Sequence, residues 1–230
     1  MEVQSIIIDD IQKLRENTVQ NIFSESEDAE IRSSESSELI LGQTTPLGNI
    51  SELTESLILT SASNVNPQTL DSFNISCIIS CAPELPESPL HDEVIYHKIE
   101  VIDSGCSRIL QYFDPAADLI HQVSSLGGKT LVYCVAGVSR SASICLAYLM
   151  KYQKLSLLEA YNYVKLRRPR IKPNCGFFKQ LIEYEKQLFG CNTVEMVFNE
   201  FVQMEIPDVY QCDYKVPASY VKKRCKNGRY

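Results

Sequence analysis

The sequence predicts an α/β domain in which a central, mainly parallel, twisted sheet is flanked by helices. Two observations predict this class. From about Ile50, short β-type runs alternate with stretches of helical periodicity, which is typical of a sheet with helices packed on it. The stretch 141–152 is apolar on nearly every side, so we expect this helix inside the domain. Hydrophobic residues make up 44% of the 230, enough for a well-buried core.

The β-type runs come first in the domain. Four strands are expected, over residues 57–60, 75–80, 94–98 and 130–134. Between and after these runs, helical periodicity predicts helices over 112–123 and 141–152. The order of strands and helices along the chain therefore supports parallel strands joined by helical crossovers.

Two further helices carry signals at their ends. One begins at Ser156, where Glu159 three residues later completes a capping box, and ends before Pro169. The last begins near Asn174, a favourable N-cap residue, and ends by Gly190.

Charge and composition divide the chain into three parts. The first 40 residues contain ten acids and three bases, whereas the rest of the chain is balanced. Within this start, residues 24–37 are a polar, Ser-rich tract with almost nothing to bury. We therefore expect an acidic, disordered extension over 1–49, a globular catalytic domain over 50–190, and an appendage over 191–230 that ends in a basic tail.

Several classes of protein are excluded or disfavoured. The longest purely apolar run, 144–150, has seven residues, whereas a membrane span needs roughly 18. Asp9 and Asp10 interrupt the only early apolar stretch, which argues against a secretory signal. The nine cysteines form no C-x-x-C pair and the three histidines no ligand spacing, so we expect no metal and no other cofactor. We expect the cysteines to be reduced thiols. The protein is expected in the cytoplasm, with the nucleus as a second location.

One segment carries a specific chemical signal. Cys134 ends a predicted buried strand, Arg140 follows six positions later, and a buried helix begins at once. A loop of this length can turn successive backbone N–H groups inward at the positive end of the helix dipole, which forms a nest for phosphate. The guanidinium of Arg140 adds a planar fork for two phosphate oxygens. The residues expected to bind phosphate are Val135, Ala136, Gly137, Val138, Ser139 and Arg140.

The same surroundings favour the thiolate of Cys134. Thiols placed in this way have pKa values of roughly 3.5 to 7.5. Cys134 would attack phosphorus to form a cysteinyl-phosphate, which water then hydrolyses. Ser141 can donate a hydrogen bond to the sulfur as it leaves. The alternative is a buried structural cysteine that happens to precede Gly137 and Arg140. Six specified positions in the correct strand-to-helix context favour the phosphate loop.

The motif C-x5-R-S at 134–141 is that of the cysteine-dependent protein phosphatases. The segments AGVSRSASICLAYLMK at 136–151 and LLEAYNYVKLRRP at 157–169 resemble the small atypical dual-specificity phosphatases, as do PNCGFFKQL at 173–181 and YEKQLFG at 184–190. The resemblance runs from about Ile50 to Pro207 and leaves out the acidic extension. It implies the cysteine-dependent phosphatase fold and metal-independent hydrolysis of phosphotyrosine and phosphoserine/threonine in phosphoproteins, with MAP kinases as a possible substrate class.

The resemblance also implies two further site residues. Asp103 matches the aspartate that protonates the leaving group and then deprotonates the attacking water, a role worth about 10² to 10⁴ in rate. Asp114 and Asp118 are the competing candidates, but both fall within a predicted helix, where a solvated or capping role is expected. Asn174 would help to hold the phosphate loop in shape, which is compatible with its role as a helix cap.

The chain departs from the family pattern at one position. The family usually has His before the cysteine, and here the residue is Tyr133. Tyrosine can donate a hydrogen bond but carries no positive charge near neutral pH. We expect weaker activity and a higher thiol pKa than in a relative with His. The alternative function is a phosphopeptide-binding pseudophosphatase of low activity, against which the intact Cys134, Arg140 and Asp103 weigh.

Other features bear on substrate and regulation. The uncharged loop residues favour phosphoproteins over polyphosphorylated inositol lipids. A basic cluster either attracts acidic phosphopeptides or is an ordinary solvated helix end; it comprises Lys165, Arg167, Arg168, Arg170 and Lys172. An RNA 5′-phosphatase would need a longer basic track, so no nucleic acid is expected as a partner.

Cys81 ends the strand that is expected beside the strand of Cys134. It could therefore form a redox bridge with the Cys134 thiol.

Overall fold

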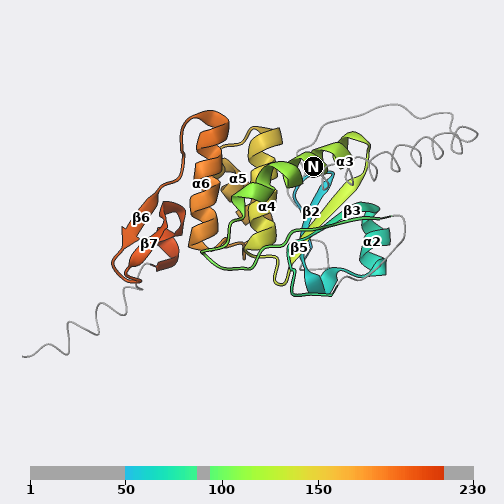
Figure 1. Cartoon of the computed structure of the whole chain (residues 1–230), viewed down its shortest axis with the longest axis horizontal. Helices are drawn as coiled ribbons and strands as arrows, with labels where there is room; N and C mark the ends of the chain where they lie inside the picture. Colours follow the sequence, from blue (N-terminus) through green and yellow to red (C-terminus); the bar gives the residue numbers. More distant parts are fainter. Residues whose placement is uncertain (1–49, 87–93, 215–230) are drawn as a thin grey trace, which may run out of the picture.

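A five-stranded sheet forms the centre of the protein (Figure 1). The structure is a computed structural model that describes residues 50–86 and 94–214. In spatial order the strands are β1 (Ser51–Glu52), β2 (Leu57–Ser61), β5 (Lys129–Cys134), β3 (Ile75–Ser80) and β4 (Ile95–Lys98). β2, β5, β3 and β4 are parallel, and the short β1 is antiparallel to β2. The predicted fold class is confirmed.

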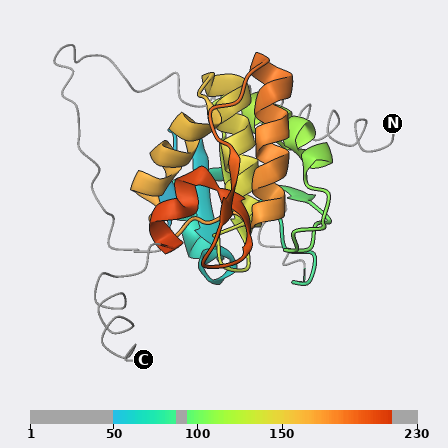
Figure 2. The same ribbon diagram turned by 90° about the vertical axis from the view of Figure 1, so that its left-hand side faces the viewer.

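Helices cover the sheet unequally (Figures 1 and 2). One face packs against α3 (Phe113–Ser125) and α4 (Arg140–Gln153), and α5 (Leu157–Arg167) and α6 (Cys175–Phe189) pack in turn against α4. The other face packs against α2 (Pro67–Phe73) in a smaller core. Short 3-10 helices are η1 (Ala62–Asn64), η2 (Leu110–Tyr112) and η3 (Asp208–Tyr214). α4 is buried throughout residues 140–150, which confirms its predicted place inside the domain.

Alternation along β5 separates the two faces. Val132 and Cys134 belong to the main core under α3–α6, whereas Leu131 and Tyr133 belong to the smaller core with α2. Because β5 lies in the middle of the sheet and ends at Cys134, the loop to α4 sits at the carboxyl edge of the parallel strands. This edge is where open α/β sheets usually bind ligands.

The predicted helix ends are confirmed in detail. Ser156 and Glu159 form the capping box reciprocally, and the backbone N–H of Ser156 donates to Glu159 Oε2 at 2.9 Å. Asn174 caps α6 by accepting from the N–H of Phe177 at 2.9 Å. Gly190 ends α6 with φ of 77°, a left-handed conformation that suits glycine. β1 and α2 were not predicted, since both are short.

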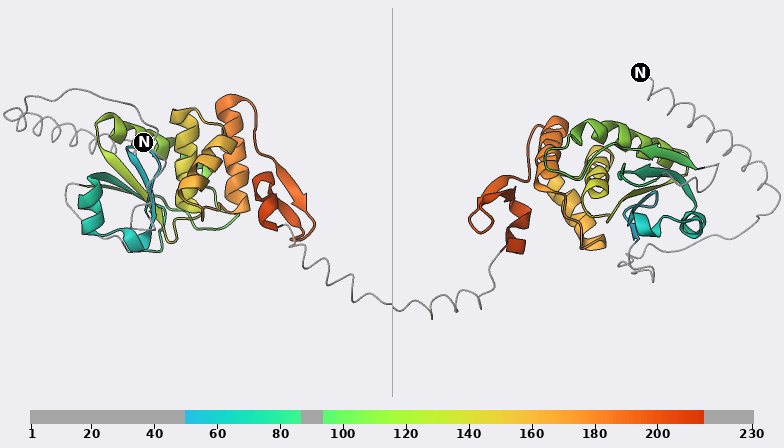
Figure 3. Two further views of the ribbon diagram at one scale, coloured as in Figure 1. Left: turned by 180° about the vertical axis from the view of Figure 1, so that it is seen from behind. Right: turned by 60° about the horizontal axis from the view of Figure 1, so that its bottom comes forward.

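Residues 191–214 pack against the domain and do not extend away from it. A hairpin of β6 (Met196–Asn199) and β7 (Met204–Pro207) lies beside α6, at the end of the molecule away from α2 (Figure 3). Val194, Ile206 and Tyr210 are buried in the main core. This part of the expected appendage therefore contributes to the core, while the domain boundary at residue 190 stays a prediction. The acidic extension and the basic tail lie outside the described residues.

No helix within 50–86 and 94–214 has the length and apolar character that a membrane crossing requires. Over the same residues, His, Cys, Asp and Glu side chains form no group of three or more that could hold a metal ion.

Candidate active site

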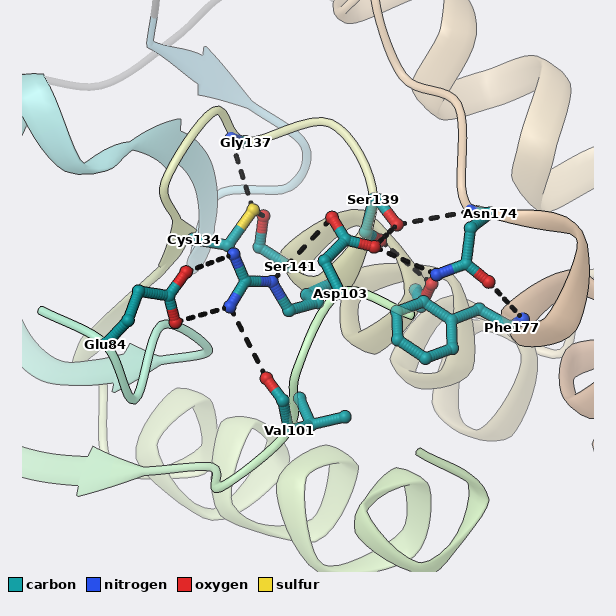
Figure 4. Close-up of polar contacts among 11 residues, drawn as sticks. Glu84, Val101, Asp103, Cys134, Gly137, Ser139, Ser141, Asn174 and Phe177 are labelled. Atoms are coloured by element: carbon teal, nitrogen blue, oxygen red, sulfur yellow. Dashed lines mark hydrogen bonds and ion pairs between the residues drawn. The ribbon is translucent and has the colours of Figure 1, made fainter. Parts of the chain in front are cut away.

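The phosphate loop, residues 134–140, curls around the sulfur of Cys134 (Figure 4). The N–H of Gly137 donates to Sγ at 3.2 Å, and the hydroxyl of Ser141 donates to it at 3.1 Å. Gly137 has φ of 64°, and a Cβ there would overlap the carbonyl of Thr60 and the guanidinium of Arg168. Only glycine therefore fits at this turn.

These donors set the acidity of the thiol. Burial alone would raise the pKa of Cys134, but the hydroxyl of Ser141 and the N–H groups of Ser141, Val138 and Gly137 more than offset burial. The pKa of Cys134 is therefore lowered from its ordinary value. A buried structural cysteine with no donors around it would show the opposite shift.

Arg140 lies next to the sulfur with a side chain only 5% exposed. Its Nη1 and Nη2 donate to the two carboxylate oxygens of Glu84 at 2.8 and 2.7 Å, which fixes the plane of the guanidinium. Its Nε is buried and has no hydrogen-bond partner within the described residues. A buried N–H without a partner is costly, so this donor is suited to an incoming oxyanion.

Glu84 was not predicted from the sequence. It follows β3 by four residues, at the same edge of the sheet as the phosphate loop. An acidic residue just after a strand neighbouring that of Cys134 is the signal that could have found it, because the carboxyl ends of parallel strands meet at one edge. Its pairing with Arg140 lowers the pKa of the Glu84 carboxyl.

Asp103 lies at the mouth of the loop, on the segment after β4 (Figure 4). Its Oδ1 accepts from the hydroxyl of Ser139 at 2.7 Å and from Nδ2 of Asn174 at 2.9 Å. Its Oδ2 is 3.8 Å from Nε of Arg140. One oxygen is thus held by two donors, and the other faces the side on which phosphate would bind.

The competing aspartates lie elsewhere. Asp114 and Asp118 are on α3, where both pair with Lys151 of α4, at 2.6 and 2.7 Å. Asp114 also accepts from the hydroxyl of Tyr184 at 2.8 Å. These contacts tie α3, α4 and α6 together, and the choice of Asp103 as the acid of the site stays a prediction.

Asn174 connects the phosphate loop to both Asp103 and α6. Its backbone N–H donates to Oγ of Ser139 at 3.2 Å, its Nδ2 to Asp103, and its Oδ1 accepts from Phe177. The two roles considered for Asn174, helix cap and loop support, are thus both present in its contacts.

The basic cluster after Val164 is not a single exposed surface. Arg168 is 2% exposed, and its Nε and Nη2 donate to the carbonyls of Gly137 and Ala136 at 2.6 and 3.2 Å. Lys172 pairs with Asp213 at 3.1 Å. The idea that Arg168 meets an acidic peptide or lies solvated is wrong, because it is buried behind the phosphate loop. Sequence reasoning placed it correctly near the end of α5 but gave no sign of this contact.

Tyr133 and Cys81 lie close to the loop. The hydroxyls of Tyr133 and Tyr96 share a hydrogen bond of 2.9 Å on the face of the sheet opposite Cys134. Burial and Tyr96 raise the pKa of Tyr133.

The N–H of Cys81 donates to the carbonyl of Tyr133 at 2.8 Å, and burial raises the pKa of the Cys81 thiol. Cys81 and Cys134 are both free thiols in this structure. Loop support by Tyr133 and a bridge between the two cysteines stay predictions.

Comparison with known proteins agrees with this geometry. Residues 57–187 match the family model described as "Dual specificity phosphatase, catalytic domain". Dual specificity protein phosphatase 14 of Bos taurus is 48% identical over 166 residues, which are 72% of this chain and 82% of the relative. The solved structure of human DUSP28 is 32% identical, with a TM-score of 0.59 over 61% of this chain and 98% of that one. A human tyrosine phosphatase-like serine/threonine/tyrosine-interacting protein is 29% identical, with a TM-score of 0.57 over 60% and 96%. The chain belongs to the dual specificity phosphatases and is a dual-specificity protein phosphatase.

Proposed function

We propose that the protein hydrolyses phosphotyrosine and phosphoserine/threonine in other proteins through a cysteinyl-phosphate, without a metal. One observation carries this proposal: the sulfur of Cys134 lies within a ring of donors beside an Nε of Arg140 that has no hydrogen-bond partner among the described residues. The ring favours the thiolate, and the guanidinium is placed to bind the phosphate oxygens.

In the first step the thiolate of Cys134 attacks phosphorus. A sulfur–phosphorus bond forms, and the bond from phosphorus to the substrate oxygen breaks. Oδ2 of Asp103 faces the loop, so a proton on this carboxyl passes to the leaving oxygen. Arg140 and the loop N–H groups stabilise the charge that builds up on the phosphoryl oxygens.

In the second step water hydrolyses the intermediate. Asp103, now ionised, takes a proton from the water, whose oxygen forms a bond to phosphorus while the sulfur–phosphorus bond breaks. Ser141 donates to Sγ at 3.1 Å, so it stabilises the thiolate that leaves. Inorganic phosphate and the starting enzyme are the products.

The rim of the site supports a phosphoprotein substrate. Val135 in the loop is 45% exposed, and Ile102 beside Asp103 is 71% exposed. These apolar side chains suit the side chain and backbone of a phosphopeptide, and the loop carries no lysine that would favour a polyphosphorylated headgroup. We propose phosphorylated signalling proteins as substrates, MAP kinases among them, in the cytoplasm and the nucleus, and no nucleic acid.

Turnover of para-nitrophenyl phosphate and of phosphotyrosine and phosphothreonine peptides tests the proposal. Wild type and Cys191→Ser, which removes an exposed thiol, are expected to be active, whereas Cys134→Ser is expected to be inactive. Rapid quenching of wild type in acid should trap phosphate on Cys134. A wild type that binds the phosphopeptides without turnover would contradict the proposal and support the pseudophosphatase alternative.

A further inference from the structure

A second buried guanidinium, that of Arg168, contacts the backbone of the phosphate loop. Arg168 directly follows α5 and is 2% exposed. It donates from Nε to the carbonyl of Gly137 at 2.6 Å and from Nη2 to the carbonyl of Ala136 at 3.2 Å. A buried arginine is costly unless its donors are used, so two bonds to one short loop are a specific arrangement.

The planarity of the peptide bond connects these carbonyls to the sulfur. In a trans peptide, the carbonyl of one residue and the N–H of the next point in opposite directions. Drawing the Ala136 carbonyl outward therefore turns the N–H of Gly137 inward, and drawing the Gly137 carbonyl outward does the same for Val138. These two N–H groups are among the donors that lower the pKa of Cys134, and Gly137 N lies 3.2 Å from Sγ.

Space around the loop agrees with a fixed arrangement. Gly137 has a left-handed backbone, and an added Cβ would overlap both the guanidinium of Arg168 and the carbonyl of Thr60. The loop at Gly137 is thus packed tightly against Arg168 and the end of β2. Its neighbour Arg167 differs, since it is exposed and stacks on the ring of Tyr163 at 3.6 Å.

We propose that Arg168 is a positioning residue for the phosphoryl transfer: it holds the carbonyls of Ala136 and Gly137 outward, so that the N–H groups of Gly137 and Val138 converge on the sulfur and on a bound oxyanion. This inference rests on the proposed function, because it assigns Arg168 a role in the same site. Arg168 acts through the loop backbone and does not itself touch the substrate.

Three variants test the proposal: Arg168→Lys, Arg168→Met and, as the matched control, Arg167→Met. The readouts are the inhibition constant for orthovanadate, taken as the vanadate concentration that halves the rate of inactivation by iodoacetate, and the pH midpoint of that inactivation, with thermal unfolding as the measure of stability. Arg168→Lys keeps the charge but loses the two-pronged geometry. It is expected to weaken vanadate inhibition about tenfold and to raise the midpoint, and Arg168→Met to weaken inhibition up to about a hundredfold. Arg167→Met should change the inhibition constant less than about twofold.

A merely structural role would give a different result. If either folded variant at Arg168 loses thermal stability but keeps the wild-type inhibition constant and midpoint, the proposal is overturned. If Arg168→Met does not fold, Arg168→Lys alone decides in the same way. Neither readout requires turnover, so a wild type that binds vanadate but hydrolyses no phosphopeptide would overturn the proposed function and leave the comparison of variants valid.

Discussion

Cys134 and Tyr133 are adjacent in the chain but lie on opposite faces of β5, in very different surroundings. The sulfur of Cys134 accepts hydrogen bonds from a hydroxyl and from backbone N–H groups, which lower its pKa. The hydroxyl of Tyr133 shares a hydrogen bond with the hydroxyl of Tyr96, and burial raises the pKa of Tyr133. This difference indicates that the phosphate loop and the start of α4 set the pKa of the Cys134 thiol. Substitutions around the sulfur should therefore have large effects on activity, and substitutions at Tyr133 small ones.

Among variants that keep Cys134, the largest effect is expected for Asp103→Asn. Asparagine keeps the shape that accepts from Ser139 but can neither give nor take the proton, so kcat for a phosphoserine peptide should fall about 10²- to 10⁴-fold. The loss should be much smaller for para-nitrophenyl phosphate, whose leaving group needs little protonation. Equal losses for both substrates would contradict the role of Asp103 as acid. Asp114→Asn is the matched control and should retain activity.

Arg140→Lys is expected to come next. Lysine cannot pair with Glu84 through two parallel bonds and also present an N–H to phosphate, so kcat/KM should fall about 10²- to 10³-fold. Glu84→Gln leaves Arg140 in place but weakens the pairing that orients its guanidinium. This variant should give a smaller loss of kcat/KM in the same assay. A Glu84→Gln enzyme as active as wild type would show that Glu84 does not orient Arg140.

Ser141→Ala separates the two steps of the reaction. The variant loses the hydroxyl donor at 3.1 Å, so the pKa of Cys134 should rise and hydrolysis of the cysteinyl-phosphate should slow by about tenfold or more. Rapid-mixing kinetics with para-nitrophenyl phosphate should then show a burst of product followed by slow turnover. A steady state without a burst, at the wild-type thiol pKa, would remove Ser141 from both roles.

The smallest effect is expected at Tyr133. A histidine there can carry positive charge, so Tyr133→His should lower the thiol pKa slightly and raise activity modestly. Tyr133→Phe, which removes only the hydroxyl bonded to Tyr96, should behave like wild type. An unchanged thiol pKa in Tyr133→His would show that the family difference at this position does not act on the sulfur.

The contiguous parts of the site could be predicted from the sequence, and the parts that meet only in three dimensions could not. Cys134, Arg140 and Ser141 lie on one strand-loop-helix segment, so local geometry was enough to place them together. Asp103 was implied by the family resemblance. Glu84 and Arg168 were missed because each meets the loop across long separations, 56 residues between Glu84 and Arg140 and 31 between Gly137 and Arg168.

The fold shows the same limit. The four main strands and four long helices were predicted because each has a long enough pattern or a clear cap. β1 has two residues and α2 has seven, too few for periodicity to stand out, although α2 begins with the ordinary signals of Asn66 as N-cap and Pro67. The hairpin of β6 and β7 was missed because its packing on α6 depends on tertiary contacts of Val194, Ile206 and Tyr210.

The acidity of Cys134 tests the central claim most directly. Inactivation by iodoacetate measured from acidic to basic pH reports the thiolate fraction, because only the thiolate reacts. We predict a midpoint well below the ordinary thiol value of about 8.5, with protection by vanadate and loss of the reaction in Cys134→Ser. A midpoint at or above that value, unaffected by vanadate, would contradict a thiolate held ready for phosphoryl transfer.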